Sequence, residues 1–371
     1  MEFSYWEIKE WLSNVDFTIV GSGITGLSCA LALREKYPKA KMLILEKGLL
    51  PQGASTKNAG FACFGSVSEL LDDLQHQSEE NTLALVEKRW KGLALLRKNL
   101  GDKAIDYQHH SGFELFQNHQ REVYEECLEK IEYLNRLLRP HFEKNVFSTV
   151  KNDFGFKKVF PLLIKNAFEG QLDTGKMMRA LLQKAYQERI LILNGISFES
   201  YSNDNTRVHI KTDHFSFIAK KLFIATNGYA SQLGLDTVKP ARAQVLITKP
   251  IEKLKIKGTF HMEEGYYYFR NIDNRILFGG GRNLDLKGET TTELAQTDQI
   301  QNQLESLLGT VILPDNMYEI EHRWSGIMGV GNHKNPILKT LGPHVFCGVR
   351  LGGMGVAIGS LTGRELAAFV N

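Results

Sequence analysis

Three glycines and one carboxylate near the start of the chain have the types and the spacing of a dinucleotide-binding turn. Gly21, Gly23 and Gly26 form the pattern G-x-G-x-x-G, and Glu46 follows the last of them by twenty residues. The first glycine permits a tight turn, the second lets backbone approach a pyrophosphate, and the third lets a helix pack closely on a strand. A carboxylate at that distance accepts hydrogen bonds from a ribose diol.

The residues around this turn predict the elements that must position it. Residues 17–20 (FTIV) form the apolar, β-branched run of a buried strand, and residues 42–45 predict a second one. Between them, residues 24–36 predict a helix whose N-terminal N–H groups would face the phosphates. Three glycines alone are a weak signal, but strand, glycines, helix, strand and acid in this order favour a nucleotide site. The alternative is a buried turn that binds nothing.

A second glycine-rich turn lies near the C-terminus. Gly352, Gly353 and Gly355 stand between a predicted strand and a predicted terminal helix, in the segment RLGGMGVAIGSLTGRELA. Glycine leaves the backbone open, and a helix N-terminus offers free N–H groups. We consider three functions for this turn: a second phosphate site, a donor of hydrogen bonds to an electron-rich ring, and a simple packing turn.

Composition narrows the class of protein. A length of 371 residues suggests two domains, and 43% hydrophobic with 23% charged residues is typical of a globular protein. The net charge of +3 without a basic stripe argues against nucleic acid as the main partner. No run of eighteen apolar residues predicts a membrane span. The cysteines are widely scattered, which indicates neither a disulfide framework nor a zinc motif and favours the reducing cytoplasm: Cys29, Cys63, Cys127 and Cys347.

The remaining patterns predict a mixed architecture. Helices are predicted over 66–100, 120–140 and 291–309, and another begins at Asp173 or Thr174. Residues 190–193 and several segments between 207 and 281 predict strands. At the start of the chain, Tyr5, Trp6 and Trp11 are expected to pack on the first domain, although a membrane-surface helix is the alternative.

Seven segments, in chain order, resemble the FAD-dependent amine and amino-acid oxidase superfamily. This superfamily includes D-amino-acid oxidase, glycine oxidase and γ-glutamylputrescine oxidase, and the last type is the most similar. Besides the glycine turn with Glu46, the similar segments are GASTKNAG, GQLDTGKMMRALLQKA, LFIATNGYA, YYYFRNIDNRILFGGG, RWSGIMGVGNHKNPILKTLG and the C-terminal glycine segment.

The resemblance implies an α/β fold, with a Rossmann-like FAD-binding domain and an α+β substrate domain built on a mixed or antiparallel sheet. The first domain would comprise residues 1–75, 155–235 and 322–371, and the second 76–154 and 236–321. It also implies non-covalent FAD and these cofactor-binding residues: Gly21, Gly23, Ile24, Thr25, Gly26, Glu46, Lys47, Ser55, Thr56, Lys57, Asn58, Ala59, Gly60, Thr226, Asn227, Gly228, Arg350, Gly352, Gly353, Met354, Gly355 and Val356.

Two departures from the family pattern bear on the substrate. No arginine follows the segment Trp324–Ser325–Gly326, where related enzymes often clamp a carboxylate, and Met354 replaces the histidine of S-G-H-G. An amine, or an N-substituted amine anchored by another cation, therefore fits better than a plain amino acid. The candidate anchors are Arg242, Arg270 and Arg282.

The function predicted from these residues is oxidation of a carbon–nitrogen bond, by transfer of a hydride to flavin N5 and hydrolysis of the resulting imine. Tyr267, Met328 and Met354 are the predicted residues of the catalytic pocket, and no metal is predicted. Such a reaction requires positioning and a dry pocket more than a strong base. Two alternatives remain open: a flavin module of a tRNA-modifying system and a non-catalytic flavin-binding protein. The sequence favours neither oxygen nor a quinone as electron acceptor.

Overall fold

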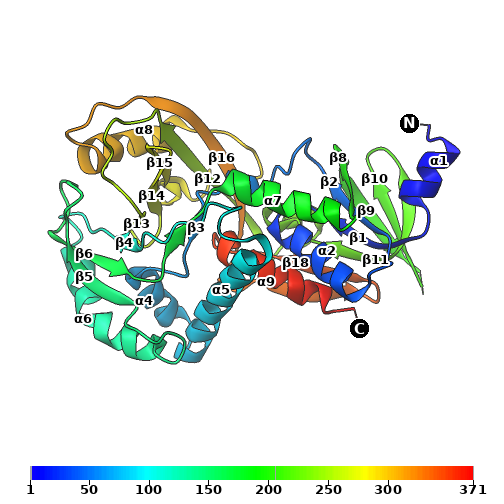
Figure 1. Ribbon diagram of the computed structural model, residues 1–371, viewed down its shortest axis with the longest axis horizontal. Coiled ribbons are helices and arrows are strands. Elements are labelled where there is room, and N and C mark those ends of the chain that lie inside the picture. The colour runs from blue at the N-terminus through cyan, green and yellow to red at the C-terminus, as the bar shows by residue number, and fades with distance from the viewer. Residues whose placement is uncertain (1, 205, 371) are drawn as a thin grey trace.

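The computed structural model describes residues 2–204 and 206–370, and over these residues the strands form two large sheets in two halves of the molecule (Figure 1). The first sheet lies in the half that carries both chain ends, and the second lies in the other half. A short third sheet of β3 (Phe61–Ala62) and β7 (Gly170–Gln171) pairs two segments far apart in the chain. The predicted α/β fold with a second, α+β half is confirmed.

The first sheet is built around the predicted strand–turn–helix–strand unit. β1 (Val15–Val20) lies between β11 (Ser216–Ile224) and β2 (Met42–Glu46) and pairs with both in parallel. β18 (Val345–Val349) and β8 (Leu191–Asn194) extend it in parallel on either side. Antiparallel strands complete the sheet: β9 (Phe198–Asn203), β10 (Val208–Thr212) and β17 (Ile337–Gly342). Every residue of β2 is buried, as expected for a parallel strand covered on both faces.

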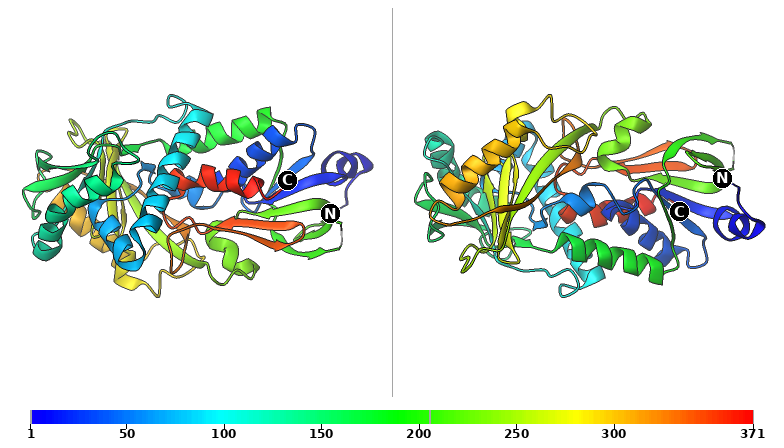
Figure 2. Two further views of the ribbon diagram at one scale, coloured as in Figure 1. Left: turned by 90° about the horizontal axis from the view of Figure 1, so that it is seen from below. Right: turned by 90° about the horizontal axis from the view of Figure 1, so that it is seen from above.

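Three helices lie side by side against this sheet: α2 (Ile24–Lys36), α7 (Thr174–Gln187) and α9 (Gly355–Ala367) (Figure 2). α2 and α9 approach closely because Gly363 faces Thr25, where a Cβ would lie 2.5 Å from the Thr25 carbonyl oxygen. Asp173 caps α7, since its carboxylate accepts the N–H of Lys176 at 2.8 Å. The short α3 (Ala54–Lys57) follows β2.

The second sheet has the predicted mixed character. Its strands, in order across the sheet, are β16 (Ile320–Val330), β12 (Lys239–Thr248), β15 (Arg275–Gly280), β14 (Tyr267–Ile272), β13 (Thr259–Met262), β4 (Gly112–Glu114), β6 (Leu162–Asn166) and β5 (Phe147–Lys151). All neighbours are antiparallel except β13 and β4, which are parallel. α8 (Asp298–Leu307) packs on strands β12 to β15, and α4 (Val67–His76), α5 (Glu79–Leu100) and α6 (Arg121–Leu138) pack near β5 and β6.

Several predicted elements need correction. The helix predicted over 66–100 is two helices: α4 ends at His76, where Gln77 is extended, and α5 begins after Ser78, whose hydroxyl accepts the Asn81 N–H at 3.3 Å. The helix predicted over 291–309 begins only at Asp298. The domain boundaries remain a prediction. β6 and most of β16 lie in ranges predicted for the first domain, but both strands pair into the second sheet.

The N-terminal segment folds into α1 (Tyr5–Glu7) and η1 (Ile8–Leu12). The expected packing of its aromatic side chains is wrong, since Tyr5, Trp6 and Trp11 are 67%, 66% and 41% exposed. Across residues 2–204 and 206–370, no helix is both long and apolar enough to cross a membrane.

Candidate functional site

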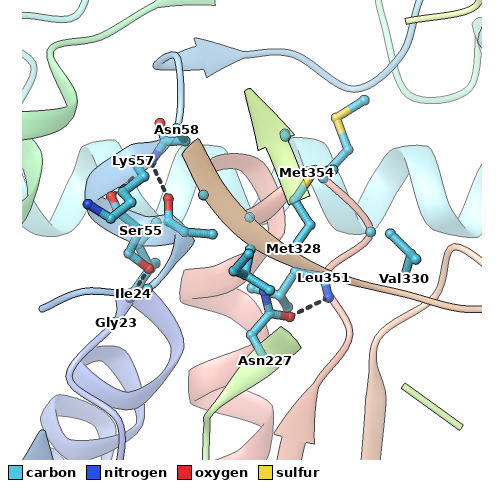
Figure 3. A pocket seen from close by; sticks show the side chains of 18 of the residues that line it. Gly23, Ile24, Ser55, Lys57, Asn58, Asn227, Met328, Val330, Leu351 and Met354 are labelled. Carbon is cyan, nitrogen blue, oxygen red and sulfur yellow. Dashed lines mark hydrogen bonds between the residues drawn. The ribbon is translucent and has the colours of Figure 1, made fainter. Parts of the chain in front are cut away.

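A cavity of about 770 Å³ runs between the two halves and is lined by residues from both. One end is formed by the glycine turn after β1, Glu46 and α3, and the other by β12, β14, β16 and the C-terminal glycine loop. Figure 3 shows part of this cavity, with Gly23, Ile24 and Ser55 on one side and Met328 and Met354 on the other. The fold thus brings most of the predicted site residues together.

The three glycines of the first turn have different surroundings. Gly21 has φ of +102°, and a Cβ there would lie 2.9 Å from the carbonyl oxygen of Ala225. Gly23 lines the cavity. Gly26 does not, because it faces the turn itself: a Cβ would lie 1.9 Å from the Gly21 carbonyl oxygen. Gly26 therefore serves helix packing rather than ligand contact.

Two buried hydroxyl groups at this end of the cavity lack partners. Among the described residues, nothing hydrogen-bonds to Thr25 Oγ1 or Thr226 Oγ1, although both atoms are buried in residues that line the cavity. The Ile24 N–H, also at the start of α2, donates to Ser55 Oγ at 3.0 Å (Figure 3). Buried polar atoms without partners are rare in folded proteins. The two unpaired hydroxyl groups, near the N-terminus of α2, fit a diphosphate as ligand.

Glu46 is 7% exposed and holds the turn together. Its Oε2 accepts the Ser22 N–H at 3.0 Å and the Ser22 hydroxyl at 2.6 Å, and its Oε1 accepts the Gly48 N–H at 3.0 Å. Oε1 also accepts the Gln52 N–H at 3.4 Å, so four protein donors already surround a carboxylate that has about four lone-pair positions, and a ribose hydroxyl would have to share or replace the weakest of these contacts. This second, structural task of Glu46 could not be seen in the sequence pattern.

α3 and the residues after it link the first end of the cavity to β16. The Trp324 indole N–H donates to the Lys57 carbonyl oxygen at 2.9 Å, which ties α3 to β16. The Asn58 side chain donates to the Ser55 carbonyl oxygen at 2.8 Å. In Figure 3 the Lys57 ammonium lies on the Gly23 side, away from Met354. Lys47, Ala59 and Gly60 also line the cavity.

The C-terminal glycine loop opens α9 toward the cavity. Gly352 and Gly353 have φ of +58° and +80°, and Gly355 and Val356 line the cavity at the first turn of α9. Asn227, which follows β11, fixes the start of this loop, because its Oδ1 accepts the Leu351 N–H at 3.1 Å (Figure 3). The first N–H groups of a helix have no partner within it, so this end offers donors to a ligand.

Four residues predicted to bind the cofactor lie outside the cavity: Gly26, Thr56, Gly228 and Arg350. The Thr56 hydroxyl donates to the Pro51 carbonyl oxygen at 2.6 Å. Gly228 packs on β16, where a Cβ would lie 2.5 Å from the Met328 carbonyl oxygen. Arg350 donates from Nε and Nη2 to the Asn335 carbonyl oxygen at 3.0 and 2.9 Å. These four residues therefore support the segments that line the cavity and do not line it themselves.

The prediction of Tyr267 as a pocket residue is wrong. Tyr267 is 1% exposed and packs in the apolar core with Phe278, whereas Tyr266 and Tyr268 line the cavity. Side chains alternate along a strand, so a choice one residue off selects the opposite face. Tyr268 lies over Gly279, and its burial raises the pKa of its hydroxyl to about 12. Met328 and Met354 line the cavity.

The three candidate anchor arginines have different surroundings. Arg242 is paired with Glu289 at 2.9 and 2.7 Å. Arg270 donates to the Leu172 carbonyl oxygen at 2.8 Å, and burial lowers the pKa of its guanidinium to about 10. Only Arg282, of these three, lines the cavity, with its guanidinium 5.8 Å from the centre of the Tyr266 ring.

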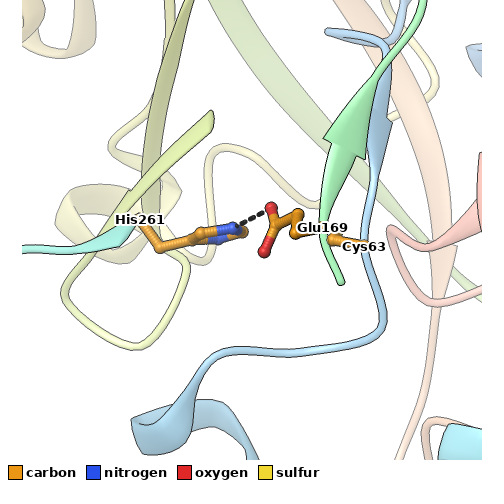
Figure 4. Close-up of side chains that lie close together, drawn as sticks. All are labelled: Cys63, Glu169 and His261. Carbon is orange, nitrogen blue, oxygen red and sulfur yellow. Dashed lines mark hydrogen bonds and ion pairs between the residues drawn. The ribbon is translucent and has the colours of Figure 1, made fainter. Parts of the chain in front are cut away.

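A buried cluster beside the cavity was not predicted. His261 Nε2 lies 2.6 Å from Glu169 Oε1, and His261 Nδ1 lies 3.8 Å from Glu69 Oε2. Burial opposes protonation of His261, but Glu169 and Glu69 outweigh it and raise the pKa of the imidazole to about 9. Cys63 completes the cluster (Figure 4), and its Sγ lies 3.6 Å from Met354 Sδ. Because these residues are about a hundred positions apart, no local spacing could indicate them.

Comparison with known proteins places the chain among flavin enzymes. A sequence model of the DAO family, described as FAD dependent oxidoreductase, matches residues 16–369. γ-Glutamylputrescine oxidoreductase of Escherichia coli is 24% identical over 95% of this chain and 82% of its own length. A probable oxidoreductase, OrdL, of Haemophilus influenzae is 20% identical over 96% of this chain and 83% of its own. Glycine oxidase from Geobacillus kaustophilus has a similar structure, with a TM-score of 0.75, 18% identity and coverage of 96% and 95% of the two chains.

Proposed function

Because the chain belongs to the DAO family of FAD-dependent oxidoreductases, we propose that it oxidises the carbon–nitrogen bond of an amine or N-substituted amino acid. The family is one of FAD enzymes, and FAD is the cofactor. The observation that carries the proposal is the single cavity that joins the dinucleotide turn to a face of apolar and aromatic side chains from the second sheet. A cofactor that binds at one end can thereby present its ring to a substrate at the other.

Residues of the first half would hold FAD along its length. Gly21, Gly23 and the start of α2 would bind the diphosphate, and Glu46 would accept one ribose hydroxyl. The N–H groups of residues 353–356 would face the pyrimidine end of the ring, where negative charge grows on reduction. When bound, FAD accepts a hydride from the carbon next to the amine nitrogen, and water hydrolyses the imine product.

The other end of the cavity would position the substrate and exclude water. Ala243, Val245 and Met328 form an apolar wall on strands β12 and β16. The Tyr268 ring lies beside this wall and packs over Gly279 of β15. A neutral amine can then lose a hydride without a protein base, because its lone pair stabilises the developing cation. Burial keeps the Tyr268 hydroxyl protonated, so that it is available as a hydrogen-bond donor to the substrate.

The names of similar proteins support an amine or amino-acid substrate. They include γ-glutamylputrescine oxidoreductase, glycine oxidase and an L-proline dehydrogenase from P. horikoshii. Arg282, the candidate anchor that reaches the cavity, favours a substrate with an acidic group. The four cysteines are all unpaired, which favours the cytoplasm as the location.

Anaerobic flavin bleaching tests this proposal. The purified yellow protein is mixed without oxygen with amines, N-methyl amino acids and D-amino acids, and the loss of oxidised flavin absorbance is followed. We expect at least one class to bleach the parent and to bleach Tyr268→Phe more slowly, while Tyr267→Phe, altered on the core face, behaves like the parent. A protein that keeps its colour with every class would be a flavin-binding protein without this activity. Retention on tRNA at moderate salt would instead favour the RNA-modifying alternative.

A further inference from the structure

We propose that Cys63, Glu169 and His261 form a binding site for one Zn²⁺ ion in the wall of the cavity. The three side chains each offer one ligand atom, and these sulfur, oxygen and nitrogen atoms all lie within 4.8 Å of one another (Figure 4). All three residues are buried, with exposed fractions of 4%, 0% and 4%. A thiol, an imidazole and a carboxylate are the ligand types that zinc takes in proteins.

The pairing of the short strands β3 and β7 builds this site. Phe61 pairs with Gln171 and Ala62 pairs with Gly170, so the next position in the antiparallel register sets Cys63 opposite Glu169. His261 comes from β13 in the second sheet. Gly112 leaves room for the carboxylate, because a Cβ there would lie 2.1 Å from Glu169 Oε2. Three segments from both halves of the molecule thus converge on one point.

Glu169 has an oxygen atom that the protein leaves unsatisfied. Its Oε1 is bonded to the Thr259 hydroxyl at 2.8 Å and to His261 at 2.6 Å. Its Oε2 is buried and has no hydrogen-bond partner among the described residues. A buried carboxylate oxygen without a partner is costly, and a metal ion would satisfy it. This orphan oxygen points to a ligand, which the ion pair with His261 alone does not supply.

The two ring nitrogens of His261 each face a carboxylate. A ligating imidazole usually directs its other ring nitrogen at a carboxylate, which fixes the ring. Here Glu69 Oε2 faces His261 Nδ1 at 3.8 Å, an ion-pair distance longer than a hydrogen bond, and Nε2 would bind the ion in place of its present 2.6 Å contact with Glu169 Oε1. Tetrahedral zinc needs ligand atoms about 3.4 to 3.7 Å apart, from bond lengths of about 2.0 to 2.3 Å, so a side-chain shift of about 1 Å suffices.

Three protein ligands leave a fourth position, and its direction follows from the cavity. Cys63 and His261 both line the cavity, next to Met354 of the C-terminal loop. A site with three protein ligands and an open position is the arrangement that zinc enzymes use to bind a water or a substrate oxygen. The bound ion would therefore face the compartment in which we place the substrate.

Metal analysis of the flavin-loaded protein tests the proposal. The parent, Cys63→Ser, Glu169→Gln and the control Cys127→Ser are incubated with Zn²⁺, passed over a desalting column and assayed for zinc and flavin per chain. Cys127 is also a buried free cysteine, but it packs in the helical core around α6. We expect about one zinc per chain in the parent and in Cys127→Ser, and an at least tenfold lower content in the two site variants.

X-ray absorption at the zinc edge of the loaded parent gives an answer that needs no variant to fold. The proposal expects one sulfur neighbour at about 2.3 Å among nitrogen and oxygen neighbours at about 2.0 to 2.1 Å. It is overturned if the parent retains less than a tenth of an equivalent, if Cys63→Ser retains zinc like the parent, or if the spectrum contains no sulfur neighbour. Any of these results would leave the His261–Glu169 pair as an ordinary buried ion pair.

Discussion

Replacing Glu46 by glutamine separates the two tasks of this carboxylate. Its two oxygens accept the backbone N–H groups of Ser22 and Gly48, both at 3.0 Å, and a third donor, the Ser22 hydroxyl, lies at 2.6 Å. An amide has only one acceptor oxygen, so in either orientation its NH₂ group faces a backbone N–H. Glu46→Gln therefore loses at least one charged hydrogen bond and leaves a buried donor without a partner.

The size of the effect follows from these contacts. One charged hydrogen bond contributes about 1.5 to 3 kcal/mol, and we expect the free energy of unfolding of the FAD-free protein to fall by about 2 to 3 kcal/mol. If Glu46 also binds the ribose, FAD affinity falls by a similar amount, which is about 30- to 150-fold in Kd. Urea unfolding of the FAD-free protein measures the first effect, and titration with FAD followed by flavin fluorescence measures the second.

Asp16→Asn is the matched control. Asp16 also accepts a backbone N–H, that of Lys41 at 2.7 Å, but it lies at the opposite end of β1 and does not line the cavity. This variant should lose stability and keep the Kd of the parent for FAD. The reasoning is refuted if Glu46→Gln binds FAD as tightly as the parent, or if Asp16→Asn weakens FAD binding to the same extent.

Three further predictions concern the turn and the substrate wall. Gly23→Asp should abolish FAD retention, read from the flavin-to-protein absorbance ratio, because it adds bulk and negative charge in the cavity beside Ser55. Gly26→Ala should lower the melting temperature of the FAD-free protein, because its Cβ would lie 1.9 Å from a carbonyl oxygen, whereas Gly175→Ala, whose nearest atom is a side-chain oxygen at 3.3 Å, should not. Tyr268→Phe should raise KM but leave the pH dependence of kcat/KM unchanged up to about pH 10, because the Tyr268 pKa of about 12 keeps the hydroxyl protonated there; a changed profile would give Tyr268 a role in proton transfer.

The elements around the first turn could be predicted because their signals are local. The glycines, the helix after them and the carboxylate at the end of β2 lie within about thirty residues, and each has a backbone or packing reason to be there. The structural task of Glu46 was hidden, since it depends on the N–H groups of Ser22 and Gly48, which become donors only once the turn has formed.

The substrate wall was less predictable because a strand pattern shows that side chains alternate between two faces but not which face lines the cavity. Three consecutive tyrosines fit either face of β14, and only the packing of α8 on the sheet decides that Tyr267 is buried and Tyr268 faces the cavity. The cluster of Cys63, Glu169 and His261 could not be predicted from the sequence, because it depends on the pairing of β3 with β7 across about a hundred residues.

The packing of α2 on α9 brings the two glycine turns to one cavity. Gly359 faces Ile24 and Gly363 faces Ser28, so the two helices run in parallel. The start of α2 lies beside the second turn of α9. Both N-termini consequently open into the same cavity, and the Ser28 and Ser360 hydroxyls meet between them at 3.3 Å. Parallel helix dipoles repel each other at their N-terminal ends unless negative charge lies there. The diphosphate of FAD would place negative charge at one end, and the pyrimidine edge of the ring would add it at the other on reduction, so the packing that costs energy in the empty protein would favour the bound and reduced one.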